Sequence, residues 1–534
     1  MTLFVSTLPQ FLLCWALLII PSSSFPPSNR FAVVSGTLLR RHNLSPEKVA
    51  AAREELVDVE TVDLCIVGGG ISGLASAITA AEKNRDASIL LLESESTIGG
   101  RVRSDYTSDG YTLDRGFAVF IEEYPTSKKL LDYDSLGLAQ FLPGARVKLA
   151  DRDDLAPVSD PLRRRRDILK AITSPVGSLV DKARLVPLFY NVVTKNVEDL
   201  FSMEETNTLT CLKDKYKFSD EFISSFFAPF LEGIYLTPLE KQSSRMFHFV
   251  FRMFTLGSAS LPAGGMQSVT NQLGNKAQNL GVKIECDSLV LSLEKDDLNK
   301  RFRLRVKSHS NPKSERVVKA SSVVIATDEM VSRRLLGNVD GLNKINDLPV
   351  LSQRSVGCIY YAFPSPAPLQ EPILILNGEG NESRNSKDFP INNVCFPSVV
   401  QQNGYAPDGY ELCSVSMLEN AINEHSRDIE SLDSSVRNQL AKWFPSHASQ
   451  IMDESTWELK GIYFINNAQP CHFEEDGSAN IHGGRDCTKY RGISLTPGIF
   501  VAGDHVATST FNGALESGVN AGEAASSFLQ VIRF

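Results

Sequence analysis

The sequence lacks three features: paired cysteines of the CxxC type, an apolar run long enough to cross a bilayer, and an excess of basic residues. The nine cysteines are dispersed over the chain and form no disulfide framework, so we expect them to be reduced and packed in the interior. The net charge of −9 excludes a general nucleic-acid binder, because neutralising phosphates requires a basic face. At 534 residues the chain exceeds one ordinary hydrophobic core, so we expect more than one domain.

The N-terminal segment predicts delivery to another compartment. The apolar run Phe11–Ile20 has the length of a signal-peptide core, although no Lys or Arg precedes it, and we predict a signal peptide over residues 1–24. Residues 25–45 contain arginine and serine but no acidic residue, as transit peptides do. With Phe25 directly after three serines, the segment resembles the two-part plastid presequences of diatoms and related algae. We expect a plastid destination; a plain secretory signal and a short membrane anchor are the alternatives.

A glycine-rich turn after the first apolar strand is the most informative stretch of the chain. Residues 62–67 predict a strand that runs into Gly68, Gly70 and Gly73, and a helix follows. In this GxGxxG pattern the first glycine permits a tight turn, the second lets a pyrophosphate approach the backbone, and the third lets helix and strand pack closely. A second strand ends in Glu93, where a carboxylate can accept hydrogen bonds from a ribose. This order predicts a dinucleotide site rather than a glycine turn without a ligand.

Two further glycine motifs predict contacts with the same ligand. Gly99 and Gly100 precede Arg101, whose guanidinium can offset pyrophosphate charge or, alternatively, lie on the surface. Near the C-terminus a strand ends in Gly503 and Asp504, and a last amphipathic helix begins a few residues later. The N-terminus of that helix could face the same cleft.

The middle of the chain carries two patterns that each have two interpretations. The four arginines at residues 163–166 are either a solvated helix start or an anchor to anionic lipid. The aromatic side chains between Phe222 and Phe254 are either core or the lining of an apolar substrate channel.

Motifs spread over residues 60 to 530 together carry a family resemblance. Beyond the first glycine pattern they are Glu93 with Gly99-Gly100-Arg101, Asp114-x-Gly116, Pro262-x-Gly264-Gly265-Met266, Val290, Ala326-Thr327, Ala468-Gln469-Pro470, Ala502-Gly503-Asp504 and Gly513-Ala514-x-x-Ser517-Gly518. By these motifs the chain resembles the flavin amine oxidase superfamily, which includes phytoene desaturases, carotenoid isomerases and protoporphyrinogen oxidases. The resemblance implies FAD as cofactor, held non-covalently because no cysteine lies in a covalent attachment motif.

The resemblance also implies a fold. We expect an α/β architecture in which a Rossmann-type, glutathione-reductase-like FAD-binding domain is interleaved with an α+β substrate domain. The FAD-binding segments would be residues 60–150, 261–335 and 456–534. The substrate domain would consist of residues 151–260 and 336–455.

Contacts with FAD follow position by position from the resemblance. Glu93 would hold the adenosine ribose, Arg101 would lie near the pyrophosphate or flavin, and Val290 would contact adenine through its backbone. Asp504 would bind the ribityl-pyrophosphate region, and Gly513-Ala514 would place a helix N-terminus at the pyrimidine end, where it stabilises negative charge on the reduced flavin. The complete expected set is Gly68, Gly70, Ile71, Ser72, Gly73, Glu93, Gly99, Gly100, Arg101, Val290, Gly503, Asp504, Gly513 and Ala514.

The expected chemistry belongs to the cofactor, so the protein need only orient a C–H bond and exclude water. The sequence offers no convincing acid, base or nucleophile, so the catalytic residues stay unassigned. For His505 beside Asp504 we predict a local hydrogen-bonding role, with a place near the flavin as the alternative. No metal site is predicted, because the spacing of the candidate ligands matches no usual set. These candidates are Cys471, His472, His482 and Cys487.

The expected activity is hydride removal from, or isomerisation of, a large apolar substrate such as a carotenoid or tetrapyrrole. A flavin amine oxidase that releases hydrogen peroxide and a non-catalytic flavin-binding protein are the alternatives. The expected partners are a small apolar substrate and a membrane surface, but no nucleic acid.

Overall fold

The computed structural model describes residues 31–34, 37–40 and 59–533, except positions 117–118, 161–162, 297–300, 309, 312–313, 341, 343–349, 381–382, 426–427 and 472–495. The chain divides into two compact units, Met1–Asp58 and Val59–Phe534. In the first unit, β1 (Phe31–Val34) pairs antiparallel with β2 (Thr37–Arg40). The predicted signal peptide lies outside the described residues.

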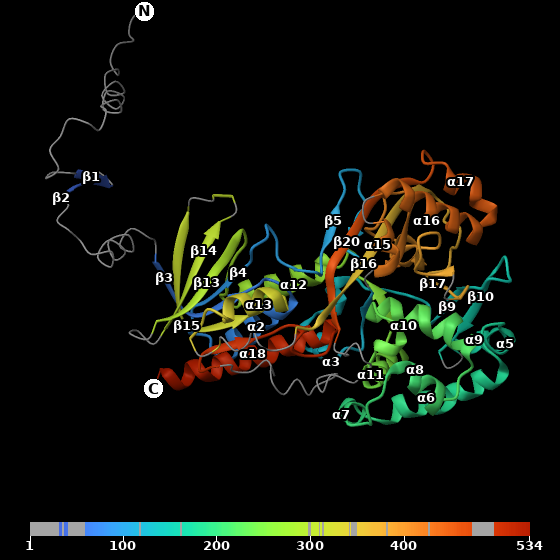
Figure 1. Cartoon of the computed structure of the whole chain (residues 1–534), viewed down its shortest axis with the longest axis horizontal. Coiled ribbons are helices and arrows are strands. Elements are labelled where there is room, and N and C mark those ends of the chain that lie inside the picture. The colour runs from blue at the N-terminus through green and yellow to red at the C-terminus, as the bar shows by residue number, and fades with distance from the viewer. Residues whose placement is uncertain are drawn as a thin grey trace, which may run out of the picture. The chain divides into compact units, whose positions relative to one another are not determined.

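The second unit contains two seven-stranded sheets, which lie at the left and right of this unit in Figure 1. The first sheet is built around β3, which pairs in parallel with β4 and β15 because helical crossovers return the chain to the same edge. Its parallel strands are β12 (Lys283–Glu285), β4 (Ile89–Leu92), β3 (Val59–Val67), β15 (Glu315–Ile325) and β21 (Ile499–Val501). Antiparallel strands extend it: β14 (Arg301–Ser308) and β13 (Ser288–Asp296).

Helices cover both faces of this first sheet. The helices on one face are α2 (Ile71–Lys83), α12 (Gln267–Asn279) and α18 (Phe511–Ile532). The helix α13 (Glu329–Leu336) packs on the other face. Small residues let α2 and α18 approach closely: a Cβ on Gly518 would stand 2.3 Å from the carbonyl oxygen of Ser72. The Ser76 hydroxyl donates a 2.9 Å hydrogen bond to the Gly518 carbonyl, which fixes the crossing.

The second sheet joins strands that are far apart in the sequence. In spatial order they are β10 (Leu155–Ser159), β9 (Gly144–Lys148), β17 (Leu374–Asn377), β18 (Ile391–Cys395), β19 (Tyr410–Leu418), β16 (Ser352–Pro364) and β20 (Glu458–Cys471). Successive side chains along each strand point to opposite faces of the sheet. One face packs against α16 (Ile429–Trp443), with α15 (Glu419–His425) and α17 (Ala448–Met452) beside it. The strands β9 and β20 belong to this second sheet, although they lie within residues 60–150 and 456–534, which the sequence analysis assigned to the FAD-binding domain.

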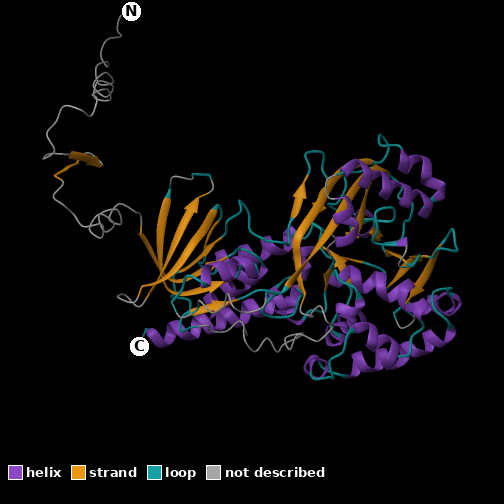
Figure 2. Cartoon of the chain, viewed as in Figure 1, coloured by secondary structure: helices purple, strands orange, loops and turns teal. Residues whose placement is uncertain are grey.

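A helical layer packs beside the second sheet around a phenylalanine-rich core (Figure 2). Its helices are α5 (Ile168–Thr173), α6 (Leu179–Thr194), α7 (Val197–Phe201), α8 (Thr208–Thr210), α9 (Asp220–Phe222), α10 (Ala228–Tyr235) and α11 (Ser244–Leu256). Short elements make the remaining connections: β5 (Ser104–Tyr106), β6 (Thr112–Asp114), β7 (Phe120–Ile121), α3 (Pro125–Leu130), α4 (Tyr133–Leu136), β8 (Ala139–Gln140), β11 (Ala259–Leu261) and α14 (Pro397–Val400).

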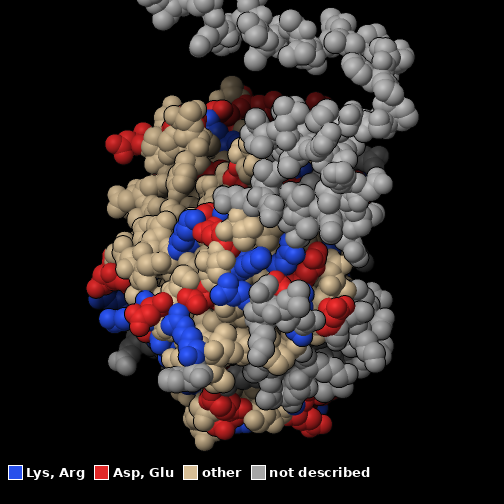
Figure 3. All heavy atoms as spheres, turned by 90° about the vertical axis from the view of Figure 1, so that its left-hand side faces the viewer, with Lys and Arg blue, Asp and Glu red and all other residues tan. Residues whose placement is uncertain are grey.

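The architecture is mixed α/β, as predicted, and several global expectations can be compared with it. All cysteines in the described part of the chain are free thiols, and Cys286 alone among those is not buried. Lys and Arg side chains are interspersed with Asp and Glu on the face shown in Figure 3. Within the described ranges, no helix has the length and apolar character needed to cross a membrane.

Candidate functional site

One cavity of about 840 Å³ connects the two sheets of the second unit. At one end its walls come from the carboxyl ends of β3, β4 and β15 and from the first turns of α2 and α18. At the other end they come from the helical layer and from one face of the second sheet. We call these parts the glycine end and the apolar end.

The glycine end is built on the start of α2. Gly70 caps this helix without a side-chain hydrogen bond and has φ −73°, which any residue can adopt. A Cβ on Gly70 would meet nothing within 4 Å, so the space beside it belongs to the cavity. A Cβ on Gly73 would stand 1.9 Å from the Gly68 carbonyl oxygen, so this glycine serves helix–strand packing instead. The unpaired backbone N–H groups and the dipole of a helix start favour an anion here.

Glu93 closes one side of the glycine end. Its buried carboxylate follows β4 and accepts hydrogen bonds from the backbone N–H groups of Gly69 (2.6 Å) and Glu95 (2.9 Å). These bonds hold the glycine turn against β4 and orient the carboxylate beside the cavity, which it lines. Its Oε1 also accepts from the Ser94 hydroxyl at 3.2 Å, so the further lone pair for a ligand hydroxyl is on Oε2.

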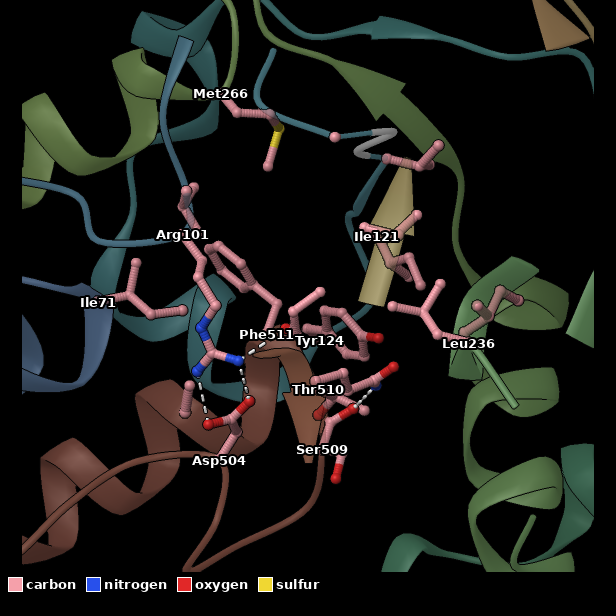
Figure 4. A pocket seen from close by; sticks show the side chains of 18 of the residues that line it. Ile71, Arg101, Ile121, Tyr124, Leu236, Met266, Asp504, Ser509, Thr510 and Phe511 are labelled. Atoms are coloured by element: carbon pink, nitrogen blue, oxygen red, sulfur yellow. Dashed lines mark hydrogen bonds and ion pairs between the residues drawn. The ribbon is translucent and has the colours of Figure 1, made fainter. Parts of the chain in front are cut away.

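Arg101 and Asp504, which are 403 residues apart in the sequence, form a bidentate ion pair across the cavity wall (Figure 4). The Arg101 guanidinium donates to the two carboxylate oxygens at 2.7 and 2.8 Å and to the carbonyl of Ala468 at 2.7 Å. The negative charge of Asp504 raises the pKa of Arg101, so the guanidinium stays charged. The positive φ of Gly503 (+150°) turns the chain at the end of β21, which brings Asp504 to the cavity.

The N-terminus of α18 also reaches the glycine end. Thr510 caps this helix, and its hydroxyl accepts a 2.9 Å hydrogen bond from the N–H of Gly513. A Cβ on Gly513 would stand 2.1 Å from the Thr508 carbonyl oxygen, so Gly513 permits the tight turn before the helix. Ala514, Phe511 and Thr510 line the cavity.

Most of the predicted site residues therefore lie around one cavity. Those that line it are Gly68, Gly70, Ile71, Ser72, Glu93, Gly99, Gly100, Arg101, Val290, Gly503, Asp504 and Ala514. Gly73 and Gly513 lie outside the lining and act through packing. The His505 ring is buried over Gly503, where a Cβ would stand 2.5 Å from its Nδ1.

The apolar end divides the predicted aromatic cluster into two groups. Phe222, Phe226 and Phe230 stack in a ladder with ring centroids 5.6 and 5.9 Å apart, since i, i+4 residues share one helix face. This ladder lines the cavity together with Phe251 and Phe254. The other members belong to the core behind it: Phe227, Tyr235, Phe247 and Phe249. The aromatic stretch thus contributes both to the core and to a cavity wall, with Phe222 and Phe251 in both, and a substrate in this cavity stays a prediction.

Several lining residues have no motif of their own. Asp328 and Arg334 follow β15, and the parallel pairing of β15 with β3 could have placed them at the shared carboxyl edge. Tyr124, Ile121 and Leu236 lie on the far side of the cavity from Arg101 in Figure 4. These three come from short elements without periodicity, so the sequence carried no signal for them.

The four candidate metal ligands do not form a described site. Cys471 is buried, and its thiol contacts the Lys241 carbonyl. His472, His482 and Cys487 lie outside the described residues. Among the residues that the structure describes, no three His, Cys, Asp or Glu side chains are grouped as metal ligands.

Curated proteins share limited stretches with this chain. It is 34% identical over 103 residues to a coproporphyrinogen III oxidase of Propionibacterium freudenreichii subsp. freudenreichii, which covers 19% of either chain. It is 27% identical over 208 residues to a carotenoid phi-ring synthase of Streptomyces griseus, covering 37% of this chain and 39% of that protein. The chain thus spans about a fifth to two fifths of these relatives' lengths.

Solved structures match over most of the chain. An oxidoreductase from Methanosarcina mazei has a TM-score of 0.61 at 16% identity, with 88% of this chain and 100% of that chain covered. Cyclohexylamine oxidase from Brevibacterium oxydans has a TM-score of 0.58 at 16% identity, with 89% and 100% covered. At such identities the likeness shows a shared fold. The sequence profile of the flavin-containing amine oxidoreductases matches residues 71–525, and the chain therefore belongs to this family of FAD-dependent enzymes.

Proposed function

We propose that the protein is an oxidoreductase that holds FAD non-covalently in the glycine end and removes hydride from, or isomerises, a large apolar substrate in the apolar end. The observation that carries this proposal is the continuity of the cavity, which joins a helix N-terminus with a glycine turn to a phenylalanine ladder. Two relatives named for a coproporphyrinogen and a carotenoid support a tetrapyrrole or carotenoid as the substrate class.

The glycine end fits a dinucleotide by its shape and its polar groups. The empty space beside Gly70 would admit the pyrophosphate to the α2 N-terminus, and the oriented carboxylate of Glu93 would accept from the ribose. Val290 directly precedes the irregularity in β13, lines the cavity at the same edge and would contact adenine. The free thiols among the described cysteines and the absence of any cysteine from the described lining favour non-covalent binding.

FAD supplies, when bound, the acceptor for a hydride from a substrate C–H bond. The chain contributes position and electrostatics. The α18 N-terminus, with Ala514 at the cavity, would stabilise negative charge that develops on the cofactor ring. The Arg101–Asp504 pair fixes the β21–α18 connection against the loop after β4, and the phenylalanine ladder excludes water.

The charges of the apolar end favour a neutral substrate over an amine. A protonated amine needs a carboxylate partner when it is buried. Asp160 is the carboxylate among the described lining residues of this end, and Arg163 already donates to it at 3.0 Å. An amine oxidase that releases hydrogen peroxide therefore remains the second candidate, and a flavin-binding protein without turnover the third.

An exposed apolar surface on α5 and α6 would bring this cavity to a membrane. We define it as Leu169, Ile172, Leu179, Val180, Val186, Tyr190 and Val193, whose side chains are 44 to 75% exposed. On α6 these residues follow one face at helical spacing. Leu185 and Phe189, on the flank of the same helix next to this face, line the cavity. A bilayer on the α5–α6 surface would thus lie one helix away from the substrate site.

A lipid bilayer is the occupant that we propose for this surface. Arg166 is exposed close to Leu169 in the sequence, and a basic residue at the margin of an apolar face favours anionic headgroups. Of the four arginines at residues 163–166, Arg163 forms an ion pair with Asp160 and Arg164 forms one with Asp167. Arg166 is therefore better placed to contact a lipid headgroup.

We also propose the finer description of the architecture and the destination. The first sheet, with helices on both faces and the cavity at its carboxyl edge, would be the Rossmann-type, glutathione-reductase-like FAD-binding domain, interleaved with the substrate domain as outlined from the sequence. The N-terminal residues would direct the protein to a plastid.

Purification of the chain and acid precipitation test this proposal. We expect about one FAD per chain, released into the supernatant by acid, and no peroxide formation with putrescine or an aromatic amine. Oxygen consumption with an amine would favour the amine oxidase, and a chain that binds no FAD after reconstitution would contradict the proposal.

A further inference from the structure

Two polar side chains interrupt the apolar end on the wall formed by the second sheet. Asn393 on β18 lies opposite Ser416 on β19 in the strand register. Their sequence neighbours Val394 and Val415 point to the other face, into the core with α16. Asn393 and Ser416 therefore face the cavity, which they line together with Leu374 of β17.

Both side chains are buried and lack partners. Asn393 is 2% exposed and Ser416 is 1% exposed. Neither the Asn393 Oδ1 nor the Ser416 Oγ has a hydrogen-bond partner among the residues that the structure describes. A buried polar atom without a partner costs about 1 to 3 kcal/mol, so a fold that keeps two of them side by side loses stability unless a ligand satisfies them.

The adjacent helix α10 leaves room for the Asn393 amide. Gly233 on α10 lines the cavity, and a Cβ there would stand 2.8 Å from the Asn393 Nδ2. Any larger residue at 233 would therefore press on the amide. The amide and the hydroxyl are neutral, and together they offer hydrogen-bond donors and acceptors. A neutral oxygen group fits them, whereas a buried charge would need a charged partner.

We propose that Asn393 and Ser416 form a polar subsite that binds a hydroxyl or carbonyl group of an otherwise apolar substrate. This inference rests on the proposed function, because it assumes that the apolar end holds the substrate. The subsite would fix how far the substrate enters the cavity and thus which C–H bond reaches the glycine end. A substrate analogue without the oxygen would leave both side chains unpaired, which is how a polar site rejects an apolar analogue.

Binding of a matched pair of probes tests the subsite. The probes are tritiated geranylgeraniol and the hydrocarbon with hydrogen in place of its hydroxyl, measured by gel filtration of the full chain in mild detergent. We expect the ratio of their dissociation constants to favour the alcohol by about tenfold more in the wild type than in Ser416→Ala or Asn393→Leu, since each hydrogen bond contributes about 2- to 13-fold. Neither substitution should lower thermal stability, because each removes an unpaired group.

Ser414→Ala is the matched control. Ser414 lies two residues away on the same face of β19, but its Oγ pairs with the Cys358 Sγ at 3.3 Å and does not line the cavity. This variant should keep the preference for the alcohol. No preference in the wild type, no binding of the alcohol, or an unchanged preference in Ser416→Ala and Asn393→Leu would each overturn the subsite. Loss of FAD from the wild-type chain would instead contradict the proposed function, and the labelled probes report binding without the flavin.

Discussion

Replacement of Gly70 by alanine should separate cofactor binding from folding. Its backbone φ of −73° suits alanine, and the added Cβ meets no protein atom within 4 Å. Alanine is a poorer helix cap than glycine by up to about 1 kcal/mol, but it also removes about 0.4 to 1 kcal/mol of unfolded-chain entropy. The free energy of unfolding should therefore change by less than about 1 kcal/mol.

The same methyl group would occupy the space that we assign to the pyrophosphate. Forcing a methyl group into a filled site costs about 1 to 3 kcal/mol, which weakens FAD binding by about 5- to 150-fold. The assay is titration of the flavin-free chain with FAD, followed by quenching of FAD fluorescence, with thermal unfolding of the flavin-free chain measured in parallel.

Gly73→Ala provides the opposite case. Its Cβ would stand 1.9 Å from the Gly68 carbonyl oxygen, so the strand and helix must separate and the flavin-free chain should melt at a lower temperature. If Gly70→Ala bound FAD as tightly as the wild type, the placement of the pyrophosphate at the α2 N-terminus would be refuted.

Three further predictions concern stability, membrane contact and targeting. Burial lowers the pKa of His248 to about 4, below its unfolded value, so stability present at neutral pH should be lost as the pH falls from about 6.5 to 4, by up to about 3 kcal/mol. Urea unfolding across this range should show a shallower dependence in His248→Gln; an equal dependence would contradict the assignment. The double variant Val186→Asp, Tyr190→Asp should weaken flotation with phosphatidylcholine–phosphatidylglycerol vesicles by at least about tenfold. The control Val531→Asp, on an exposed site of α18, should bind as the wild type does. Equal binding by the wild type, the double variant and the control would exclude the α5–α6 surface. A fluorescent protein behind residues 1–45 should enter the plastid of a diatom, and Phe25→Ala should retain it in the secretory pathway; a wild-type fusion that is secreted would refute the plastid destination.

The parts of the site that could be predicted are those whose chemistry is local. The glycines and Glu93 fall within one strand–helix–strand unit, where spacing alone determines which edge they reach. The helix α16 (Ile429–Trp443) is likewise local, because its buried residues recur at helical spacing.

Other parts depend on pairings between distant segments. The Arg101–Asp504 ion pair joins residues 403 positions apart, and β9 pairs with β17 across more than 220 residues. In neither pair does the sequence of one segment carry a local pattern that identifies the other segment. The orientation of the Asn393 and Ser416 side chains could not be predicted for the same reason. Only the pairing of β18 with β19 shows that both side chains lie on the face of the sheet that lines the cavity.

The most direct test of the account is the visible spectrum of the purified, FAD-loaded chain during anaerobic addition of a plastid lipid extract, and separately of putrescine. The account predicts that the absorbance of oxidised flavin bleaches with the lipid extract and not with the amine. Bleaching by putrescine alone would contradict the claim that this cavity acts on a large apolar substrate. A flavin spectrum that neither addition changes would contradict net hydride removal from such a substrate.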